Sequence, residues 1–275
     1  MKEFWIRFFR NRAAVLGLSI LGFVILLAIL GPLFYPDSPF KLVGHPMTAP
    51  CRNFPLGTDS LGRDVAAGIA YGAQTSLFMG LIASIVTVLL GILVGGLAGY
   101  YGSWIDQVLM RFTEIFQTIP TFIFAILLVA IMTPSIVSVI IAIVVVSWSG
   151  IARLVRGEFK SLRNREFIQA SVCLGMNDIH IMLFHILPNC LSSIIVTGSL
   201  MVANAILIES GLSFLGLGDP NKMSWGFLVG SGRSFLRQAW WISTFPGITI
   251  LLTVLAINLV GDGFNDAFNP RLRNR

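Results

Sequence analysis

The feature that most constrains this chain is an uncharged stretch between residues 115 and 151. More than 35 consecutive positions there contain no Asp, Glu, Lys or Arg. A single α-helix of that length would extend over about 50 Å, whereas the hydrocarbon core of a bilayer is about 30 Å thick. The stretch therefore has to fold back, and Thr133-Pro134-Ser135 near its middle is the predicted turn. It predicts two membrane spans, residues 114–132 and 136–152, with Pro120 placed to kink the first.

Four further apolar segments have the length of a membrane span: residues 13–34, 75–101, 190–210 and 242–262. Hydrophobic residues make up 55% of the 275 and charged residues only 12%, whereas about a quarter of a soluble domain is charged. We expect an all-α membrane protein with about six transmembrane helices. Gly91, Gly95 and Gly99 leave one face of the second span without side chains, which predicts close packing on a helix of this chain or of a partner subunit.

The segments between the spans differ in charge. Residues 1–12, 153–189 and 263–275 are rich in Lys and Arg, residues 102–113 form a predicted short turn, and residues 35–74 and 211–241 are long loops rich in Pro or Gly. If the N-terminus is cytoplasmic, 13 of the 19 Lys and Arg residues lie inside, so the positive-inside rule places both termini in the cytoplasm. Residues 1–12 are then a cytoplasmic interfacial helix and the two long loops are external. Cys51 lies outside, apart from Cys173 and Cys190, and these last two are predicted to be packing residues rather than ligands.

Residues 165–189 are the most distinctive segment between two spans. Two short amphipathic helices are predicted, residues 166–174 and 178–187, joined by a turn at Gly175 and with Asn177 or Asp178 as the second N-cap. Pro188 is expected to end the second helix before the next span begins. A helical hairpin in this position is suited to docking.

The hairpin resembles the EAA loop of permease subunits from ATP-binding-cassette (ABC) importers. The similarity lies in Glu166, Gln169, Ala170, Ser171, Gly175 and His185-Ile186-Leu187-Pro188, with Gln-Ala-Ser in place of Glu-Ala-Ala and therefore no carboxylate at position 169. Residues 56–64 (LGTDSLGRD), residues 211–218 followed by Trp225-Gly226, and residues 258–263 followed by Asn269-Pro270-Arg271 resemble the dipeptide, oligopeptide and nickel branch of that family.

The resemblance implies a type I ABC importer permease fold, with residues 75–262 as the permease core, in the bacterial cytoplasmic membrane. It implies import of dipeptides or oligopeptides, with nickel, metal chelates, opines and glutathione as alternatives. The implied partners are a homologous second permease subunit, an external solute-binding protein and two cytoplasmic ATPases, which carry ATP and Mg.

The same resemblance indicates site residues. The ATPase-coupling residues would be Glu166, Gln169, Ala170, Ser171, Gly175, Asp178, His185, Leu187 and Pro188. Contacts with the binding protein would come from Thr58, Asp59, Arg63, Asp64 and Trp225. For the first four of these the alternative is a helix at the membrane surface capped by Thr58 or Asp59, and for Trp225 it is an interfacial anchor.

Several function classes are excluded by missing motifs. The chain has no Gly-Lys pair, hence no phosphate-binding loop, and it lacks H-E-x-x-H, Cys-x-x-Cys and G-x-S-x-G. We expect no enzyme activity, no catalytic or metal site and no cofactor in this chain, and no nucleic-acid binding. The span centres carry no ionisable residue, which argues against the alternative of an ion-coupled carrier or channel. Glu209, near an outer end, is predicted to be solvated or hydrogen-bonded rather than a substrate contact. The sequence does not indicate the residues of a substrate path.

Overall fold

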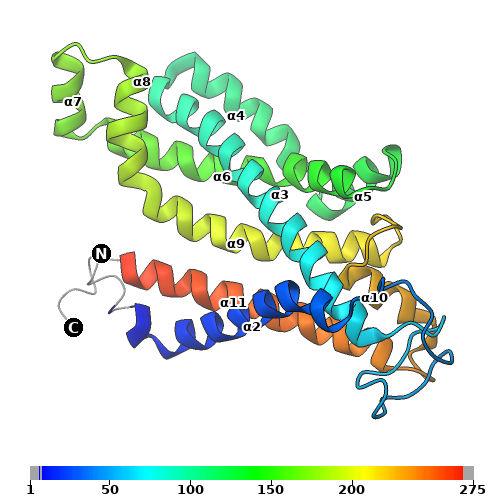
Figure 1. Ribbon diagram of the computed structural model, residues 1–275. Coiled ribbons are helices and arrows are strands. Elements are labelled where there is room, and N and C mark those ends of the chain that lie inside the picture. Colours follow the sequence, from blue (N-terminus) through cyan, green and yellow to red (C-terminus); the bar gives the residue numbers. More distant parts are fainter. Residues whose placement is uncertain (1–5, 7, 269–275) are drawn as a thin grey trace.

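The computed structural model describes residue 6 and residues 8–268, and its regular elements there are helices (Figure 1). Within these residues, five helices are long and apolar enough to cross a membrane, and a bent pair makes a sixth candidate. The five are α2 (Arg12–Phe34), α3 (Val65–Tyr101), α6 (Ile136–Arg163), the continuous helix of α8 (Asp178–His180), η1 (Ile181–Ile186) and α9 (Leu187–Phe214), and α11 (Trp241–Phe268). The short elements are α7 (Glu166–Cys173), α10 (Trp225–Gly232) and η2 (Arg233–Phe235).

The bent pair is α4 (Ser103–Thr118) and α5 (Thr121–Ile131), which meet at 86°. The predicted short turn over residues 102–113 is wrong, because helix α4 begins at Ser103, whereas the predicted kink at Pro120 lies at the bend. Pro120 is the physical reason for the bend, because a proline disfavours the helical conformation of the residue before it. Ile119 is accordingly extended, with φ −92° and ψ 130°, and the chain turns there.

Helix α3 begins at Val65, so the loop predicted over residues 35–74 is shorter than expected. Its N-cap is Asp64, whose carboxylate accepts a hydrogen bond from the Ala66 backbone N–H at 2.8 Å, and not Thr58 or Asp59. Burial raises the pKa of Asp64, against the lowering effect of hydrogen bonds from the Ala66 and Ala67 N–H groups.

The glycine series of α3 packs against α6 of the same chain. A Cβ atom placed on Gly95 would lie 2.2 Å from the carbonyl oxygen of Ala152, and one on Gly99 would lie 2.7 Å from that of Arg156. Backbones approach this closely only where side chains are absent. Of the two alternatives for these glycines, packing within the chain is therefore correct.

The two ends of the bundle differ in what they carry. The start of α2, the end of α11 and the α7–α8 hairpin lie at one end, whereas α10 and the long loop before α3 lie at the other (Figure 1). Helix α11 packs along α2 and α9, and α9 also contacts α3. Residues 1–5 and 7 of the predicted interfacial helix, and the Asn269-Pro270-Arg271 motif, lie outside the described residues. Phe8 is buried beside Phe264 of α11, with ring centroids 5.3 Å apart.

Candidate functional site

The candidate site is the hairpin formed by α7, the turn at Gly175 and α8. Gly175 has φ +73°, which favours glycine. Its N–H donates to the Val172 carbonyl at 2.9 Å and the N–H of Met176 donates to the Ser171 carbonyl at 3.2 Å. This pair of bonds is a Schellman motif, which ends α7 and satisfies its last carbonyl groups. Asn177 then caps α8 by accepting a hydrogen bond from the Ile179 N–H at 2.9 Å.

The second helix of the hairpin does not end at Pro188, as the sequence predicted. It continues through η1 into α9 as one helix from Asp178 to Phe214. The residues before the proline form a π-helical turn, in which the Leu187 N–H donates to the Met182 carbonyl. A wider turn at this point relieves the clash that a proline ring makes with the preceding turn of an α-helix. The hairpin is thus joined to α9 without a break.

One face of the hairpin is buried against the membrane helices. Ile168 on α7, together with Ile181 and Ile186 on η1, is fully buried in a cluster that includes Val155 and Phe159 of α6. Burying each such side chain contributes about 1.5–3 kcal/mol to folding. The hairpin is therefore fixed to α6 rather than loosely tethered.

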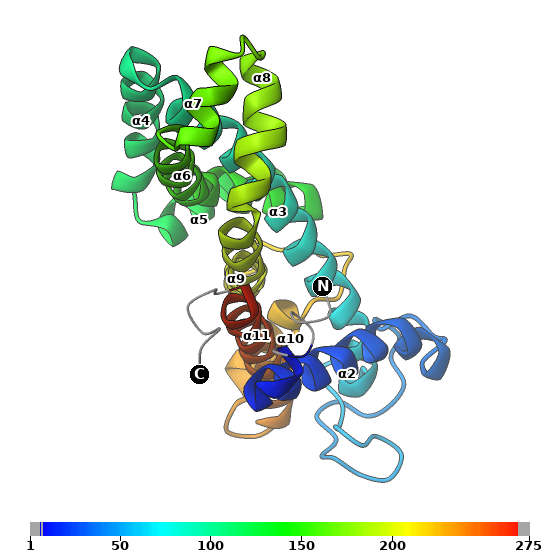
Figure 2. The ribbon, with the colours of Figure 1, turned by 90° about the vertical axis from the view of Figure 1, so that its left-hand side faces the viewer.

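The other face exposes large apolar side chains. Leu174 is 81% exposed and Phe184 is 66% exposed, and Phe167, Val172, Ile179 and Leu183 are exposed as well. Figure 2, viewed from this end of the bundle, shows α7 and α8 standing apart from α2 and α11. An apolar surface of this kind next to polar residues is typical of a protein interaction site.

The structure brings the nine predicted coupling residues together in this hairpin and the turn that follows it. Glu166, Gln169, Ala170, Gly175, Asp178 and Pro188 are exposed. Ser171, in contrast, faces inward, and its hydroxyl donates to the Phe167 carbonyl at 3.0 Å. His185 and Leu187 are half-buried, and His185 Nε2 has no hydrogen-bond partner among the described residues.

Polar contacts that the sequence analysis missed tie the hairpin end to the membrane helices. The Tyr100 hydroxyl, at the end of α3, donates to Asp178 at 2.6 Å, and the Arg163 guanidinium lies 5.5 Å from the Tyr100 ring centroid. Arg156 of α6 forms a bidentate ion pair with Asp106 of α4, with 2.6 Å between Nη2 and Oδ2. The ends of α3, α4, α6 and α8 are thereby connected.

The residues predicted to contact a binding protein mostly hold the long loop together. Thr58 is fully buried, and its hydroxyl donates to the His45 carbonyl at 2.6 Å and accepts from the Thr48 N–H at 2.9 Å. Buried Asp59 accepts from the Leu61 and Arg63 N–H groups at 2.8 and 2.9 Å.

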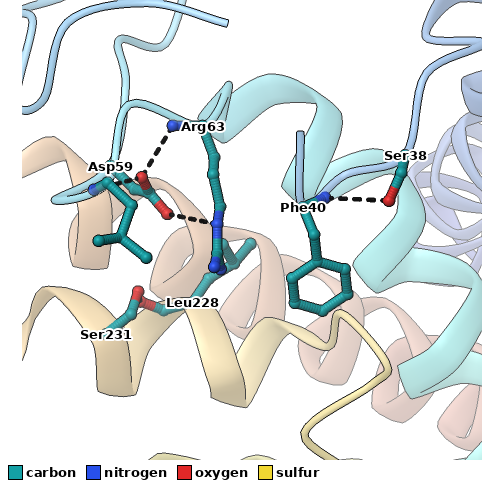
Figure 3. A network of polar contacts seen from close by, with 7 residues as sticks. Ser38, Phe40, Asp59, Arg63, Leu228 and Ser231 are labelled. Atoms are coloured by element: carbon teal, nitrogen blue, oxygen red, sulfur yellow. Dashed lines mark hydrogen bonds and ion pairs between the residues drawn. The ribbon is translucent and has the colours of Figure 1, made fainter. Parts of the chain in front are cut away.

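The Arg63 side chain extends from this loop between Asp59 and Phe40 (Figure 3). Its guanidinium lies 5.0 Å from the Phe40 ring centroid, and its Nε is 3.9 Å from Asp59 Oδ2. Arg63 and Asp64 are half-buried. Direct contact with a binding protein is therefore not open to the buried side chains of Thr58 and Asp59.

Trp225 is also buried, so neither an outer contact nor an interfacial anchor describes it correctly. Its indole N–H donates to the Ile69 carbonyl at 3.0 Å, in the interior between α3 and α10. Nearby, Glu209 is fully buried and hydrogen-bonded, not solvated: Ser76 and Ser213 donate to its carboxylate at 3.0 and 2.7 Å. Of the two cysteines predicted to be packing residues, Cys190 is buried but Cys173 is exposed, and Cys51 in the long loop is exposed as well.

Comparison with known proteins shows the family. Residues 87–274 match the model of the binding-protein-dependent transport system inner membrane component, and residues 1–49 match that of the N-terminal TM domain of oligopeptide transport permease C. The chain is 36% identical over 282 residues to the di/tripeptide transport system permease protein DppC of Pseudomonas aeruginosa, covering 100% of this chain and 93% of that protein. It is 39% identical over 272 residues to the oligopeptide transport system permease protein OppC of Haemophilus influenzae, covering 97% and 87%.

The fold has a solved counterpart as well. A chain of the MetNI methionine ABC transporter, in an inward-facing conformation, superposes with a TM-score of 0.61 at 16% identity, covering 74% of this chain and 97% of that chain. The match supports the all-helical permease architecture that the resemblance implied. The chain therefore belongs to the family of binding-protein-dependent transport system inner membrane components, as a multi-pass permease of the inner membrane and not the ATPase.

Proposed function

We propose that this chain is a permease subunit of an ATP-driven importer of dipeptides or oligopeptides. The relatives at 36% and 39% identity are a di/tripeptide permease and an oligopeptide permease, and each match covers nearly the whole of this chain. The proposal includes a type I importer fold with both termini in the cytoplasm, which agrees with the excess of Lys and Arg on that side.

The α7–α8 hairpin is the proposed site of coupling to an ATPase. The observation that carries this proposal is its two-faced burial: Ile168, Ile181 and Ile186 fix it to α6, while Leu174 and Phe184 remain exposed on the outer side. An ATPase that holds the exposed face and moves when it binds ATP would shift the whole hairpin. Because the hairpin is fixed to α6 and continuous with α9, both helices would follow.

Tyr100 extends this connection to a third helix. Its hydrogen bond with Asp178 joins the hairpin to α3, and the glycine face of α3 holds it tightly against α6. Movement of the hairpin would therefore reposition α3, α6 and α9 together between two packings of the bundle. Coupling is then a difference in contact energy between those two states.

The remaining partners follow from the same proposal. A second, homologous permease would complete the transmembrane path, two cytoplasmic ATPases would carry ATP and Mg, and a binding protein would deliver the peptide at the end that holds the long loop and α10. Exposed residues of that loop, such as Leu42 and Leu61, are available for such a contact.

The test is reconstitution of the complete complex in proteoliposomes. Uptake of a labelled dipeptide should require ATP, both ATPases and the binding protein. Liposomes that contain this chain alone should show no flux, whereas a self-sufficient channel or ion-coupled carrier would conduct without the partners. Flux through the isolated chain would overturn the proposal.

A further inference from the structure

A cavity of about 760 Å³ lies between the α4–α5 bend, α6 and α9, apart from the hairpin and the long loop. Its lining includes Phe116, Gln117, Phe122, Arg153, Thr197 and Asn204. The coupling proposal uses none of these residues. The question is what fills this volume.

The bend itself requires either burial in protein or water beside it. Helix α4 ends at Thr118 and α5 begins at Thr121, so the chain between them leaves the helical hydrogen-bond pattern within a candidate span. Backbone polar groups at helix ends lack intrahelical partners. In a bilayer such irregular backbone is tolerated only where it is buried in protein or lines a water-filled cavity. The cavity is beside this break.

Asn204 gives independent support. It lies well inside α9, its side chain is exposed, and it lines the cavity. Its amide forms no hydrogen bond with any described residue. An unpartnered amide in lipid would cost several kcal/mol. Asn204 is therefore placed to meet water or a polar solute.

The charge of the cavity is positive. Arg153 lines it and donates a hydrogen bond to Gln117 Oε1, and no Asp or Glu is among its described lining residues. The apolar rings of Phe116 and Phe122 form another part of the wall. The guanidinium of Arg153, which is exposed and lies beside these apolar walls, attracts carboxylates and repels metal cations.

We propose that this cavity is this chain's part of the substrate path, and that it takes solutes bearing a carboxylate, such as short peptides, and not free divalent metal ions. Arg153 would pair with the terminal carboxylate. Asn204 and Thr197 would hydrogen-bond to peptide amides, and the phenylalanine rings would lie beside apolar side chains. This inference rests on the proposed importer function and specifies its substrate class.

The role of the positive charge of Arg153 is tested by measuring uptake of a labelled dipeptide in the complete reconstituted transporter. Arg153→Gln should lower uptake at least about tenfold, because a charge-assisted hydrogen bond is lost. Arg153→Lys should restore most of the loss. Arg111→Gln removes an exposed cation of α4 outside the cavity and should leave uptake unchanged. Stimulation of ATP hydrolysis by the loaded binding protein should persist in Arg153→Gln, which separates a defect in the path from misfolding.

The location is tested by thiol labelling in a variant whose three native cysteines are replaced. Asn204→Cys should react with a small water-soluble methanethiosulfonate, and millimolar dipeptide should slow the reaction. Leu207→Cys, on an exposed face of α9 outside the cavity, should not react. Failure of Asn204→Cys to react would show that the cavity is not hydrated and would refute the inference.

The two proposals fail differently. Normal dipeptide uptake by Arg153→Gln, or uptake of free Ni²⁺ by the wild type at a rate comparable to that of dipeptide, would overturn the substrate class and leave the importer function intact. Absence of ATP-dependent uptake by the wild-type complex with its binding protein would overturn the importer function itself.

Discussion

Gly175 offers the sharpest test of the hairpin. A Cβ at this position would meet no atom within 4 Å, so the first atom of a side chain there clashes with nothing in the described structure. The backbone, however, has φ +73°, and an L-residue other than glycine pays roughly 1–2 kcal/mol for that conformation. The effect of Gly175→Val is therefore almost purely one of backbone conformation.

The size of the effect follows from this penalty. A cost of about 1–2 kcal/mol shifts the turn equilibrium by about 5- to 30-fold away from the conformation that makes the two Schellman hydrogen bonds. Uptake by the reconstituted Gly175→Val complex should therefore fall by at most about 30-fold, with a parallel loss of the ATPase that co-purifies with the permease. Gly175→Asn should retain most activity, because asparagine tolerates positive φ.

The assay measures dipeptide uptake, ATP hydrolysis and co-purifying ATPase in the same preparations. Gly157→Val is the matched control, since Gly157 is exposed on α6, also has open space around its Cβ position, and lacks the positive φ. Wild-type uptake by Gly175→Val with the ATPase still bound would refute the coupling role of the hairpin.

Three other changes test separate parts of the structure. Gly95→Ala should destabilise the purified chain in detergent by about 1–3 kcal/mol, because its Cβ would lie 2.2 Å from the Ala152 carbonyl oxygen. Gly22→Ala is the control, since its Cβ would meet no atom within 4 Å. Equal melting temperatures for the two variants would contradict the packing of α3 on α6. Gly150→Trp should fill the cavity and block uptake without unfolding the chain, whereas Gly157→Trp, outside the cavity, should leave uptake unblocked. Normal uptake by Gly150→Trp would contradict a substrate path at this position. Tyr100→Phe should lower the amount of dipeptide taken up per ATP hydrolysed, because it removes a hydrogen bond to the Asp178 carboxylate worth about 1.5–3 kcal/mol. Tyr71→Phe, on the same helix but far from the hairpin, is the control. An unchanged ratio of uptake to ATP hydrolysis in Tyr100→Phe would remove Tyr100 from the coupling route.

The sequence was informative where the cause of a structure is local. The hairpin could be predicted because Gly175, Asn177 and the apolar spacing around them act within a few residues. The prolines show the limit of this approach. Pro120 breaks a span, whereas Pro188 lies within a continuous helix because the π-helical turn before it accommodates the ring. That accommodation depends on the conformation of the preceding turn, which residue type alone does not reveal.

The wrong prediction for Trp225, at the end of the bundle that carries α10, and the contacts that the sequence did not reveal have a long-range cause. A tryptophan near a predicted span end usually marks the interface. Trp225 is instead buried because Gly72 of α3 leaves room for it: a Cβ on Gly72 would lie 2.8 Å from the indole ring. The Tyr100–Asp178 and Asp106–Arg156 contacts likewise join residues 78 and 50 positions apart. Such pairs cannot be recognised before the helices are placed.

Two native cysteines allow a direct test of the central claim that the hairpin is cytoplasmic and covered by an ATPase. Cys51, in the long loop, and Cys173, on α7, are both exposed, whereas Cys190 is buried. The measurement is labelling by a membrane-impermeant maleimide in right-side-out and inverted vesicles that contain the complete complex. We predict that Cys51 reacts only from outside, and that Cys173 reacts only from the cytoplasmic side and only after the ATPases are stripped. Labelling of Cys173 from outside, or equally fast labelling with active ATPases bound, would contradict the account.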